Sequence, residues 1–512
     1  MALVAVLWAV LLLVAGLSLQ WHMTHDAPIL FYMAYGMEHF GYVPYVDFFD
    51  MNAPGTHYAD ALIGRVFGYG DLGFRIADLT ALAALLALTW LLMRRYGRWV
   101  ALCATALFGA LYLGGGPDIS LQREYLALLP VAGALALATT RRARSAPVPW
   151  LLVGALLGVA TTIKPGMAVG LPAVLVYGAA VSAKRGVGQA QAGSAWSVVG
   201  ASLLGFAVPL AATALHLASV GALDDFLAIA GNYWPLYSSL SRTHEVILPS
   251  GRAAYLAGEW ARLGGLWPWM VPAALGTGLA VLAVPKRRRQ TLLLAALAVS
   301  YSVYPVVGGK FWTYHWLPFL YFAVLLSALT LIEAPRRALL RRVAIVAFLL
   351  AAALGLRPPD EVPRQLAGER WASPDVLRAE RIAGFLSESL RPGDTVQPLD
   401  WTGGAVHGML KAGARLATPF VYDFHFSHHV STGTIQDLRA RFLDELKSAR
   451  PRFIIRTETL RPWVSGPDTQ KGFHAVDEFV RENYREVHAG FGYRIYGRAG
   501  DNSGTTDDEG KR

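Results

Sequence analysis

Acidic side chains near the start of the chain are the first candidates for chemistry. The segment 21–55 carries Asp26, Glu38, Asp47 and Asp50 without any lysine or arginine, in a protein whose formal net charge is +10. Asp26 comes soon after the charge-free apolar run that opens the chain, so its carboxylate is expected close to a membrane surface. A carboxylate there could act as a general base or bind a divalent cation.

Other interpretations of these acids stay open. Acidic loops with aromatic anchors are common at membrane surfaces. Asp47 and Asp50 could equally cap local turns or help to bind an acceptor or a metal ion. Glu124 is a further acidic candidate, as a general base, an acceptor contact or a metal ligand, because it opens an apolar run beside Arg123. For Glu124, an ion pair with Arg123 or another basic group is favoured over catalysis.

Basic residues in unusual positions are candidates for holding an anion. Only eight of the 46 basic residues are lysines, and two of these, Lys164 and Lys310, border apolar runs on the side of the membrane that should be poor in positive charge. Arg123, Arg242 and Arg252 are expected on the same side. A phosphate group would explain this placement, since its charge must be balanced where water is scarce. The alternative is that these side chains only extend to the interface as anchors.

The segment 308–316, GGKFWTYHW, is a candidate clamp for that phosphate. Its two glycines allow close approach of the backbone. Lys310 would balance the phosphate charge, while Tyr314 or His315 could donate hydrogen bonds to the leaving oxygen. If a helix already begins at Lys310, then Lys310 and Tyr314 share one face. The alternative is an aromatic interfacial belt with an incidental lysine.

A histidine cluster in the sequence YDFHFSHH contains His425, His428 and His429. A zinc site is not favoured there, because no cysteine accompanies the histidines and their spacing fits no zinc finger. The single cysteine, Cys103, lies in an apolar run, which excludes an intramolecular disulfide.

The composition indicates a polytopic membrane protein. Hydrophobic residues make up 54% of the chain and charged residues 16%, and the mean hydropathy is +0.37, which is too apolar for a soluble protein of 512 residues. The arginines gather in short clusters between apolar runs, where the positive-inside rule places them. The positive charge therefore indicates membrane topology and not binding of nucleic acid.

Eleven membrane spans are expected, because a span needs about 20 apolar residues. Five basic clusters fall on one side of the spans, which predicts a cytoplasmic N-terminus and an outer C-terminus. The run before Lys164 is short, so Lys164 could lie at membrane depth facing a cavity. The predicted spans are approximately 2–20, 76–93, 99–113, 124–140, 149–163, 166–183, 196–218, 264–284, 291–307, 316–333 and 340–356. The basic clusters are 94–98, 141–144, 184–185, 286–289 and 336–342.

Residues 1–356 are thus expected to form a helical membrane domain with an outer loop over 21–75. Within this loop, 28–40 and 56–69 are predicted to be helices lying in the membrane interface. The residues expected to face lipid are Phe31, Tyr35, Phe40, Leu62, Val66 and Phe67.

Residues 357–498 are predicted to form a separate extracytoplasmic α/β domain, because spanning runs stop and strands alternate with helices. A polar tail, 499–512, is expected to be disordered. Helices are predicted near 375–390, 404–412, 435–448 and 473–485, strands at 395–398 and 452–456, and a hairpin at 486–497.

Four stretches resemble the GT-C superfamily of membrane glycosyltransferases. The opening HDAPILFYMAYGMEHFGYVPYVDFFDMNAPG is similar to the first extracytoplasmic loop of that superfamily, and QREYLAL, TTIKPG and GGKFWTYHWLP agree with it. The resemblance is greatest to bacterial members grouped with the protein O-mannosyltransferases and the aminoarabinose transferase of lipid A, and it extends over nearly the whole chain.

The resemblance implies an enzyme of the bacterial inner membrane, with its site and C-terminal domain on the extracytoplasmic side. A polyprenyl-phosphate sugar would be the donor, and a glycan, a lipid or a protein would be the acceptor, with inversion at the anomeric carbon. The family's acidic base corresponds to Asp26, and Lys310, Tyr314, His315, Lys164, Arg252 and Arg123 are candidates for the donor phosphate. Many relatives have two adjacent acids where this chain has His25 and Asp26, so no cofactor is certain and a divalent cation is only a candidate.

Two other functions remain open. A secondary transporter would have many spans, but paired halves with broken helices are expected of it and the sequence has no such symmetry. A non-catalytic protein of cell-envelope assembly could use the C-terminal domain to bind partners. A cavity that joins Asp26 to the bilayer interior would favour the enzyme.

Overall fold

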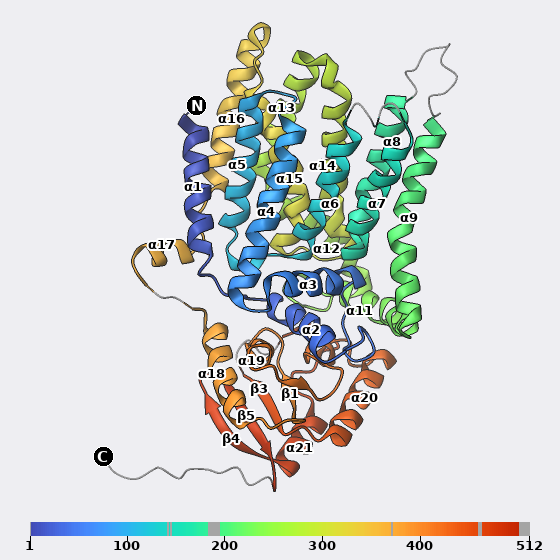
Figure 1. Ribbon diagram of the computed structural model, residues 1–512, viewed down its shortest axis with the longest axis vertical. Helices are drawn as coiled ribbons and strands as arrows, with labels where there is room; N and C mark the ends of the chain where they lie inside the picture. Colours follow the sequence, from blue (N-terminus) through green and yellow to red (C-terminus); the bar gives the residue numbers. More distant parts are fainter. Residues whose placement is uncertain are drawn as a thin grey trace.

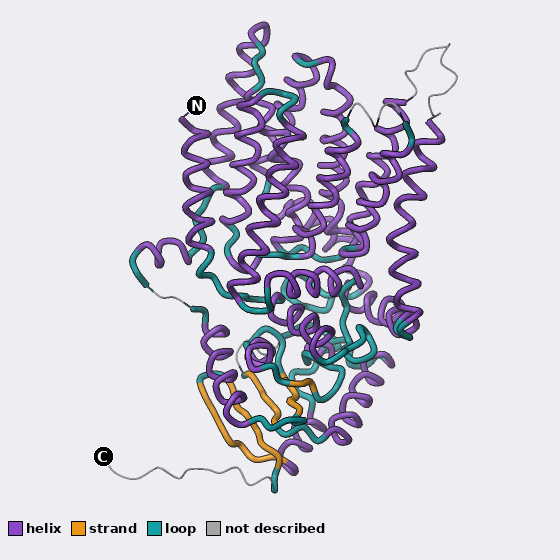
Figure 2. Tube along the Cα trace, viewed as in Figure 1, coloured by secondary structure: helices purple, strands orange, loops and turns teal. Residues whose placement is uncertain are grey.

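The computed structural model describes residues 2–140, 143, 146–182, 195–369, 372–458 and 463–500. A bundle of long helices forms one end of the molecule and a domain with all the strands of the described sheet forms the other (Figures 1 and 2). The basic residues Arg141, Arg142, Arg144, Lys184 and Arg185, on which part of the topology prediction rests, lie outside the described residues, as does the tail from residue 501.

A helix coincides with each of the eleven ranges predicted to span the membrane. The helices are α1 (Ala2–Ser18), α4 (Asp71–Met93), α5 (Arg98–Gly114), α6 (Arg123–Ala138), α7 (Val148–Ile163), α8 (Leu171–Ser182), α9 (Ala195–Ser219), α13 (Trp267–Ala283), α14 (Arg288–Gly308), α15 (Leu317–Ala328) and α16 (Ala338–Gly355).

Length and composition support a multi-pass membrane protein. Among the described residues, six helical segments are long and apolar enough to cross a membrane, and a bent pair, α12 (Pro249–Arg262) followed by α13, raises the number to seven. Three shorter apolar helices, α1, α5 and α7, fall below that length. The count of eleven spans therefore stays a prediction.

The two helices of the first loop lie between the bundle and the sheet domain, as Figure 1 shows. They are α2 (Ala27–His39) and α3 (Pro54–Phe67), and a proline begins α3, where its missing N–H costs nothing. Leu62 and Val66 are exposed, as expected of lipid-facing residues. The prediction for Phe31 is wrong, because Phe31 is buried and packs edge-on against Phe74 at 5.0 Å between ring centroids.

The helix α2 packs on protein and not on lipid. Nine of its 13 residues are buried. The Tyr32 hydroxyl donates to the Ala414 carbonyl at 2.8 Å, and α2 contacts α19 (Ala405–Ala412) of the sheet domain. An apolar helix face was recognised in the sequence, but protein covers it, from the membrane-side helices at Phe31 and from the sheet domain at Tyr32.

Short helices complete the membrane-side part. They are α10 (Leu223–Ala228), the π-helical turn η4 (Ile229–Tyr233) and α11 (Trp234–Ser238) after α9, the 3-10 helix η7 (Thr313–Trp316) before α15, and α17 (Glu361–Leu366) after α16. Residues 310–312 are not helical, so the shared helix face expected for Lys310 and Tyr314 does not form.

The C-terminal domain is a small mixed sheet with helices on both faces. Its strands are β1 (Thr395–Leu399), β2 (Arg415–Leu416), β3 (Phe453–Thr457), β4 (Tyr484–Gly490) and β5 (Tyr493–Arg498), in the order β2-β1-β3-β5-β4. The first three strands are parallel and β5 is antiparallel to β3 and β4. Besides α19, its helices are α18 (Pro374–Ser389), α20 (Gly433–Ala449) and α21 (His474–Asn483).

Candidate functional site

A polar cavity of about 80 Å³ lies where the helical bundle meets the sheet domain. Seven of the ten site residues predicted from the sequence line it, although they come from five separate parts of the chain. These seven are Asp26, Asp50, Arg123, Lys164, Lys310, Tyr314 and His315.

Asp26 precedes α2, and both of its carboxylate oxygens have basic neighbours. His25 Nδ1 lies 3.2 Å from Oδ1, and Arg123 Nη2 donates to Oδ2 at 2.9 Å. His25 has a left-handed φ of 55°, a conformation that costs a non-glycine residue on the order of 1–3 kcal/mol, so surrounding contacts must hold this turn. Burial opposes ionisation of Asp26, but His25 and Arg123 outweigh it and hold its pKa below the usual range. Asp26 is therefore an ionised carboxylate at neutral pH.

Glu124 lies behind the cavity wall at the start of α6 and organises three other side chains. Its Oε1 accepts a hydrogen bond from the Tyr304 hydroxyl at 2.5 Å and lies 3.1 Å from Lys164 Nζ and 3.3 Å from His315 Nε2. The Trp312 backbone N–H donates to His315 Nδ1 at 3.2 Å, so Nε2 carries the proton that faces Glu124. Glu124 thus pairs with basic groups and fixes the orientation of Lys164 and His315.

Lys310 is a buried amine with no counter-ion among the described residues. Its side chain is only 4% exposed, forms no ion pair within the described part of the chain, and donates to the Leu240 carbonyl at 3.1 Å. Its Nζ also lies 3.9 Å from the centroid of the Tyr237 ring. Burial lowers the pKa of Lys310 well below its usual value, and the positive charges of Arg252 and Lys164 lower it further. An anion in the cavity would offset these costs.

Nine lining residues were not among the predicted site residues, and four of them carry polar or large aromatic side chains from distant segments, namely Asn52, Tyr237, Trp401 and Tyr422. Asn52 accepts from Arg123 Nη1 at 2.7 Å, and its backbone N–H donates to Asp50 Oδ2 at 3.0 Å. The Tyr422 hydroxyl donates to Asp50 Oδ1 at 2.9 Å. Asn52 stands in the motif DMNAPG and could have been recognised, whereas Trp401 and Tyr422 come from the sheet domain and carry no local signal.

Asp50 and Asp60 are buried close behind the cavity. His57 Nε2 lies 3.2 Å from Asp50 Oδ2, and both side chains are at most 1% exposed. Asp60 has no hydrogen-bond partner at Oδ2, and burial raises its pKa to about 7. Asp50 therefore contributes to both the cavity lining and the protein interior.

A second cavity, of about 560 Å³ and largely apolar, adjoins the first. Its apolar walls come from α11 and α14, for example Trp234, Pro305 and Val307. The two cavities share six residues, which are Met51, Asn52, Lys164, Tyr237, Lys310 and His315. The amines of Lys164, which is paired with Glu124, and of Lys310 thus stand at the junction between a polar cavity and an apolar one.

Two predicted site residues lie apart from the cavities. Asp47 is exposed and accepts a hydrogen bond from the Val43 backbone N–H at 2.7 Å, as in the turn-capping alternative. Arg252 lines neither cavity, and its Nη2 donates to the Ser238 hydroxyl at 3.1 Å.

The three histidines of the YDFHFSHH sequence join the sheet domain to the loop after α9. His428 Nδ1 lies 2.8 Å from His429 Nδ1, and the Tyr233 hydroxyl lies 3.0 Å from both His425 Nδ1 and His428 Nε2. His429 Nε2 in turn lies 2.8 Å from the Ser239 hydroxyl. Burial lowers the pKa of His425 to about 3. These neutral side chains bond to one another and to hydroxyls, so they form a domain contact.

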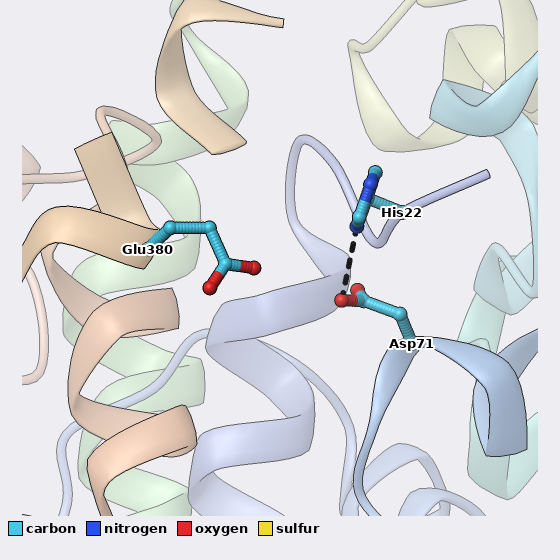
Figure 3. A group of neighbouring side chains, drawn as sticks. All are labelled: His22, Asp71 and Glu380. Carbon is cyan, nitrogen blue, oxygen red and sulfur yellow. Dashed lines mark hydrogen bonds and ion pairs between the residues drawn. The ribbon is translucent and has the colours of Figure 1, made fainter. Parts of the chain in front are cut away.

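One group of three described residues has the spacing to hold a metal ion, namely His22, Asp71 and Glu380 (Figure 3). His22 Nδ1 lies 3.1 Å from Asp71 Oδ2. The amine of Lys411 lies 2.8 Å from Asp71 and 2.9 Å from Glu380, so it already provides the positive charge between the carboxylates. We interpret this group as an ion-pair contact between the bundle and the sheet domain.

Comparison with known proteins identifies the fold. No protein-family model and no curated protein matches the chain. The structure of ArnT from Cupriavidus metallidurans bound to undecaprenyl phosphate aligns with a TM-score of 0.58 at 14% identity, over 98% of this chain and 98% of that chain. The archaeal oligosaccharyltransferase AglB from Archaeoglobus fulgidus, in complex with an inhibitory peptide and a dolichol-phosphate, aligns with a TM-score of 0.44 at 12% identity, over 97% and 75%.

The likeness to ArnT extends over the bundle and the sheet domain together. The chain is thus a multi-pass membrane protein with a GT-C-type helical bundle and a C-terminal α/β domain, as the sequence predicted.

Proposed function

We propose that this protein is an inverting glycosyltransferase that moves a sugar from a polyprenyl-phosphate donor to a glycan, a lipid or a protein at the outer face of a bacterial inner membrane. The observation that carries the proposal is the pair of adjoining cavities. One holds the ionised carboxylate of Asp26, the other is apolar, and two lysines stand between them.

An amphiphilic donor fits this arrangement of cavities. Its prenyl chain would lie along the apolar walls, which are as apolar as the lipid that the chain leaves. Its phosphate would then meet Lys164 and Lys310 at the junction, and Lys310 has no other counter-ion within the described residues. The sugar would extend into the polar cavity toward Asp26. Charge-assisted hydrogen bonds, such as those from the two lysines to the phosphate, are stronger than hydrogen bonds between neutral groups.

In the proposed reaction, the acceptor hydroxyl attacks the anomeric carbon as the bond from that carbon to the phosphate oxygen breaks. The hydroxyl proton passes to Asp26, and the electron pair of the broken bond leaves with the polyprenyl phosphate. Arg123 holds Oδ2 of Asp26, so the carboxylate stays ionised and oriented. Its low pKa makes Asp26 a weak base, but the acceptor oxygen becomes acidic as the new bond forms, and Asp26 releases the proton to water afterwards.

Cations would stabilise the leaving group. Negative charge grows on the phosphate oxygen in the transition state, and preorganised cations and donors stabilise it most in a site shielded from water. Lys310 and Lys164 are in position to do this at the cavity junction, with Tyr314 as a hydroxyl donor within the same cavity. Arg252 is near Lys310 but lines neither cavity, so its contribution would be indirect.

A divalent cation does not fit the acidic side chains of the cavity. Asp26 is paired with His25 and Arg123, and Asp50 is paired with His57 and hydrogen-bonded to Tyr422. No step of the proposed reaction therefore passes through a metal ion.

The first alternative, a transporter, gains no support from this arrangement. The sheet domain contributes Trp401 and Tyr422 to the polar cavity, so this cavity is built by both domains and not by the helices alone. A non-catalytic assembly protein would not require an ionised carboxylate in the same cavity as a buried lysine that has no counter-ion among the described residues.

Direct binding of the carrier lipid tests the proposal. The purified protein in lipid nanodiscs should bind undecaprenyl phosphate, and it should bind undecaprenol, which has the same chain without the phosphate, at least tenfold more weakly. Equal binding of the two lipids, or no binding of either, would contradict the proposal.

A further inference from the structure

A third cavity, of about 250 Å³, lies in the sheet domain and is separate from the two described above. It opens at the carboxyl ends of the parallel strands β1 and β3, where Leu399, Thr457 and Glu458 line it. None of its lining residues lines the cavity of Asp26.

The topology of the sheet makes this edge a favoured place for a ligand. From β1 the chain passes through α19 to β2 on one side, and from β2 it returns through α20 to β3 on the other side. The helices lie on opposite faces, because Ile454 belongs to the buried cluster that contains Phe442 of α20, while its neighbour Ile455 belongs to the cluster that contains Val406 of α19. In open sheets with such a reversal, the loops diverge above the carboxyl ends of the strands and leave a crevice that binds ligands.

The floor of the crevice is aromatic. Phe426 and Phe442 are stacked with their ring centroids 4.8 Å apart, and Phe473 lies 5.6 Å from Phe426. All three line the cavity. Phe426 is 3% and Phe442 is 1% exposed, so only small parts of these rings reach the cavity, and they give its floor an apolar character.

The rim of the crevice is polar and carries both signs of charge. Three carboxylates, Asp423, Glu458 and Asp477, stand against two cations, Arg456 and Lys471. Arg456 Nη2 pairs with Asp477 at 2.5 Å, and its Nε is buried without a hydrogen-bond partner. Lys471 is exposed and has no ion-pair partner in the part of the chain that the structure describes.

The aromatic floor and the polar rim together indicate which class of ligand the crevice would bind. Glu458 pairs with Arg494 at 2.9 Å and Asp477 pairs with Arg456, so the rim has little net positive charge to attract phosphates and nucleotides, which this kind of crevice often binds in other folds. Carboxylates accept hydrogen bonds from hydroxyl groups, and arginine and lysine donate to hydroxyl oxygens. A ring with hydroxyls around its edge and C–H groups on its face would satisfy the rim and the aromatic floor together.

We propose that this crevice is an accessory binding site for a sugar unit without negative charge, separate from the cavity of Asp26. The proposal does not depend on glycosyl transfer, since it concerns binding alone. It assigns the sheet domain a role in recognising carbohydrate.

Saturation-transfer difference NMR tests the proposal on the full-length protein in lipid nanodiscs. The soluble probes are glucose, glucosamine and glucose 6-phosphate. Glucose and glucosamine should receive saturation from the protein, and glucose 6-phosphate should receive several-fold less. A stronger signal from glucose 6-phosphate, or no signal from any probe, would overturn the proposal.

A cavity-filling variant locates the binding. Gly472 lines the crevice and has no positive φ, and a Cβ there would meet Asp477 Oδ2 at 3.7 Å, an ordinary contact, so Gly472→Leu fills the crevice without backbone strain. The matched control is Gly384→Leu, at an exposed glycine of α18 with open space around its Cβ position. Most of the signal should be lost in Gly472→Leu and kept in Gly384→Leu, and equal signals in the two variants would refute the site.

Two further variants keep the test independent of folding and of transfer. Lys471→Ala removes an exposed side chain without an ion-pair partner, so the fold should be unaffected while sugar binding weakens about tenfold. Asp26→Asn should keep the sugar signal, since Asp26 is in the other cavity. Loss of the signal in Asp26→Asn would assign the binding to the transfer site and overturn the proposal.

Discussion

Replacing Lys310 by methionine should weaken binding of the carrier phosphate without damaging the fold. Methionine has a similar length and no charge, so it keeps much of the packing and removes the ammonium group. The lysine is 4% exposed and stands at the junction of the polar and apolar cavities.

The size of the effect follows from the contacts of the ammonium group. A hydrogen bond to a charged partner contributes about 1.5–3 kcal/mol, so the dissociation constant of undecaprenyl phosphate should rise about 10- to 150-fold. Stability should change little. The variant loses the contacts with the Leu240 carbonyl and the Tyr237 ring, but it also loses the cost of burying a cation without a counter-ion.

The assay is binding of undecaprenyl phosphate to nanodisc-embedded protein, with thermal unfolding measured in parallel. Arg252→Met is the matched control, because Arg252 carries the same charge near Lys310 but lines neither cavity, so its effect should be about threefold or less. Unchanged binding in Lys310→Met, with a normal unfolding temperature, would refute the assignment of Lys310 to the phosphate. A marked loss of stability with normal binding would instead indicate a structural anchor.

Three further predictions concern the groups around the cavities. Glu124→Gln removes the charge that pairs with Lys164 and should lower the free energy of unfolding by about 2 kcal/mol, as measured by chemical denaturation. An unchanged free energy of unfolding would contradict the organising role of Glu124. The pKa of Asp26 is lowered in the folded protein, so Asp26 stays ionised as the pH falls, and the rate of transfer should show no loss due to Asp26 between pH 7 and about 5. The pKa of Asp60 is about 7, so Asp60→Asn is the control that removes the titration of Asp60 from this range. An inflection between pH 7 and about 5 that persists in Asp60→Asn would contradict the prediction. Tyr233→Phe removes the hydroxyl between two buried histidines and should destabilise the contact of the two domains by about 1–3 kcal/mol, seen as a lower unfolding temperature; an unchanged temperature would show that the contact carries no stability.

The positions of the helices and most strands could be predicted because they depend on local patterns. Long apolar runs predicted the helices of the bundle. Short apolar runs that alternate with amphipathic segments predicted β1, β3 and the hairpin of β4 and β5. The strand β2 has only two residues, too few to leave a pattern. Phe31 was assigned to lipid because an apolar helix face has the same sequence pattern whether lipid or protein covers it.

The chemistry of the site could be predicted in part. Acidic and basic residues at unusual places beside apolar runs marked Asp26, Arg123, Lys164 and Lys310, and the structure brings them to one cavity. Their mutual contacts could not be predicted, because they depend on how distant segments pack. Tyr422, for example, reaches Asp50 from 372 residues away along the chain.

The most direct measurement of the central claim is single-turnover transfer from a polyprenyl-phosphate sugar by wild-type protein and by Asp26→Asn. A panel of donor sugars is needed first, to find one that the wild-type protein uses. Asp26→Asn should bind the carrier lipid within a few-fold of the wild-type affinity, yet its rate of transfer should fall about 10²- to 10⁴-fold, the usual contribution of a general base. Transfer by Asp26→Asn at close to the wild-type rate would contradict the assignment of Asp26 as the base.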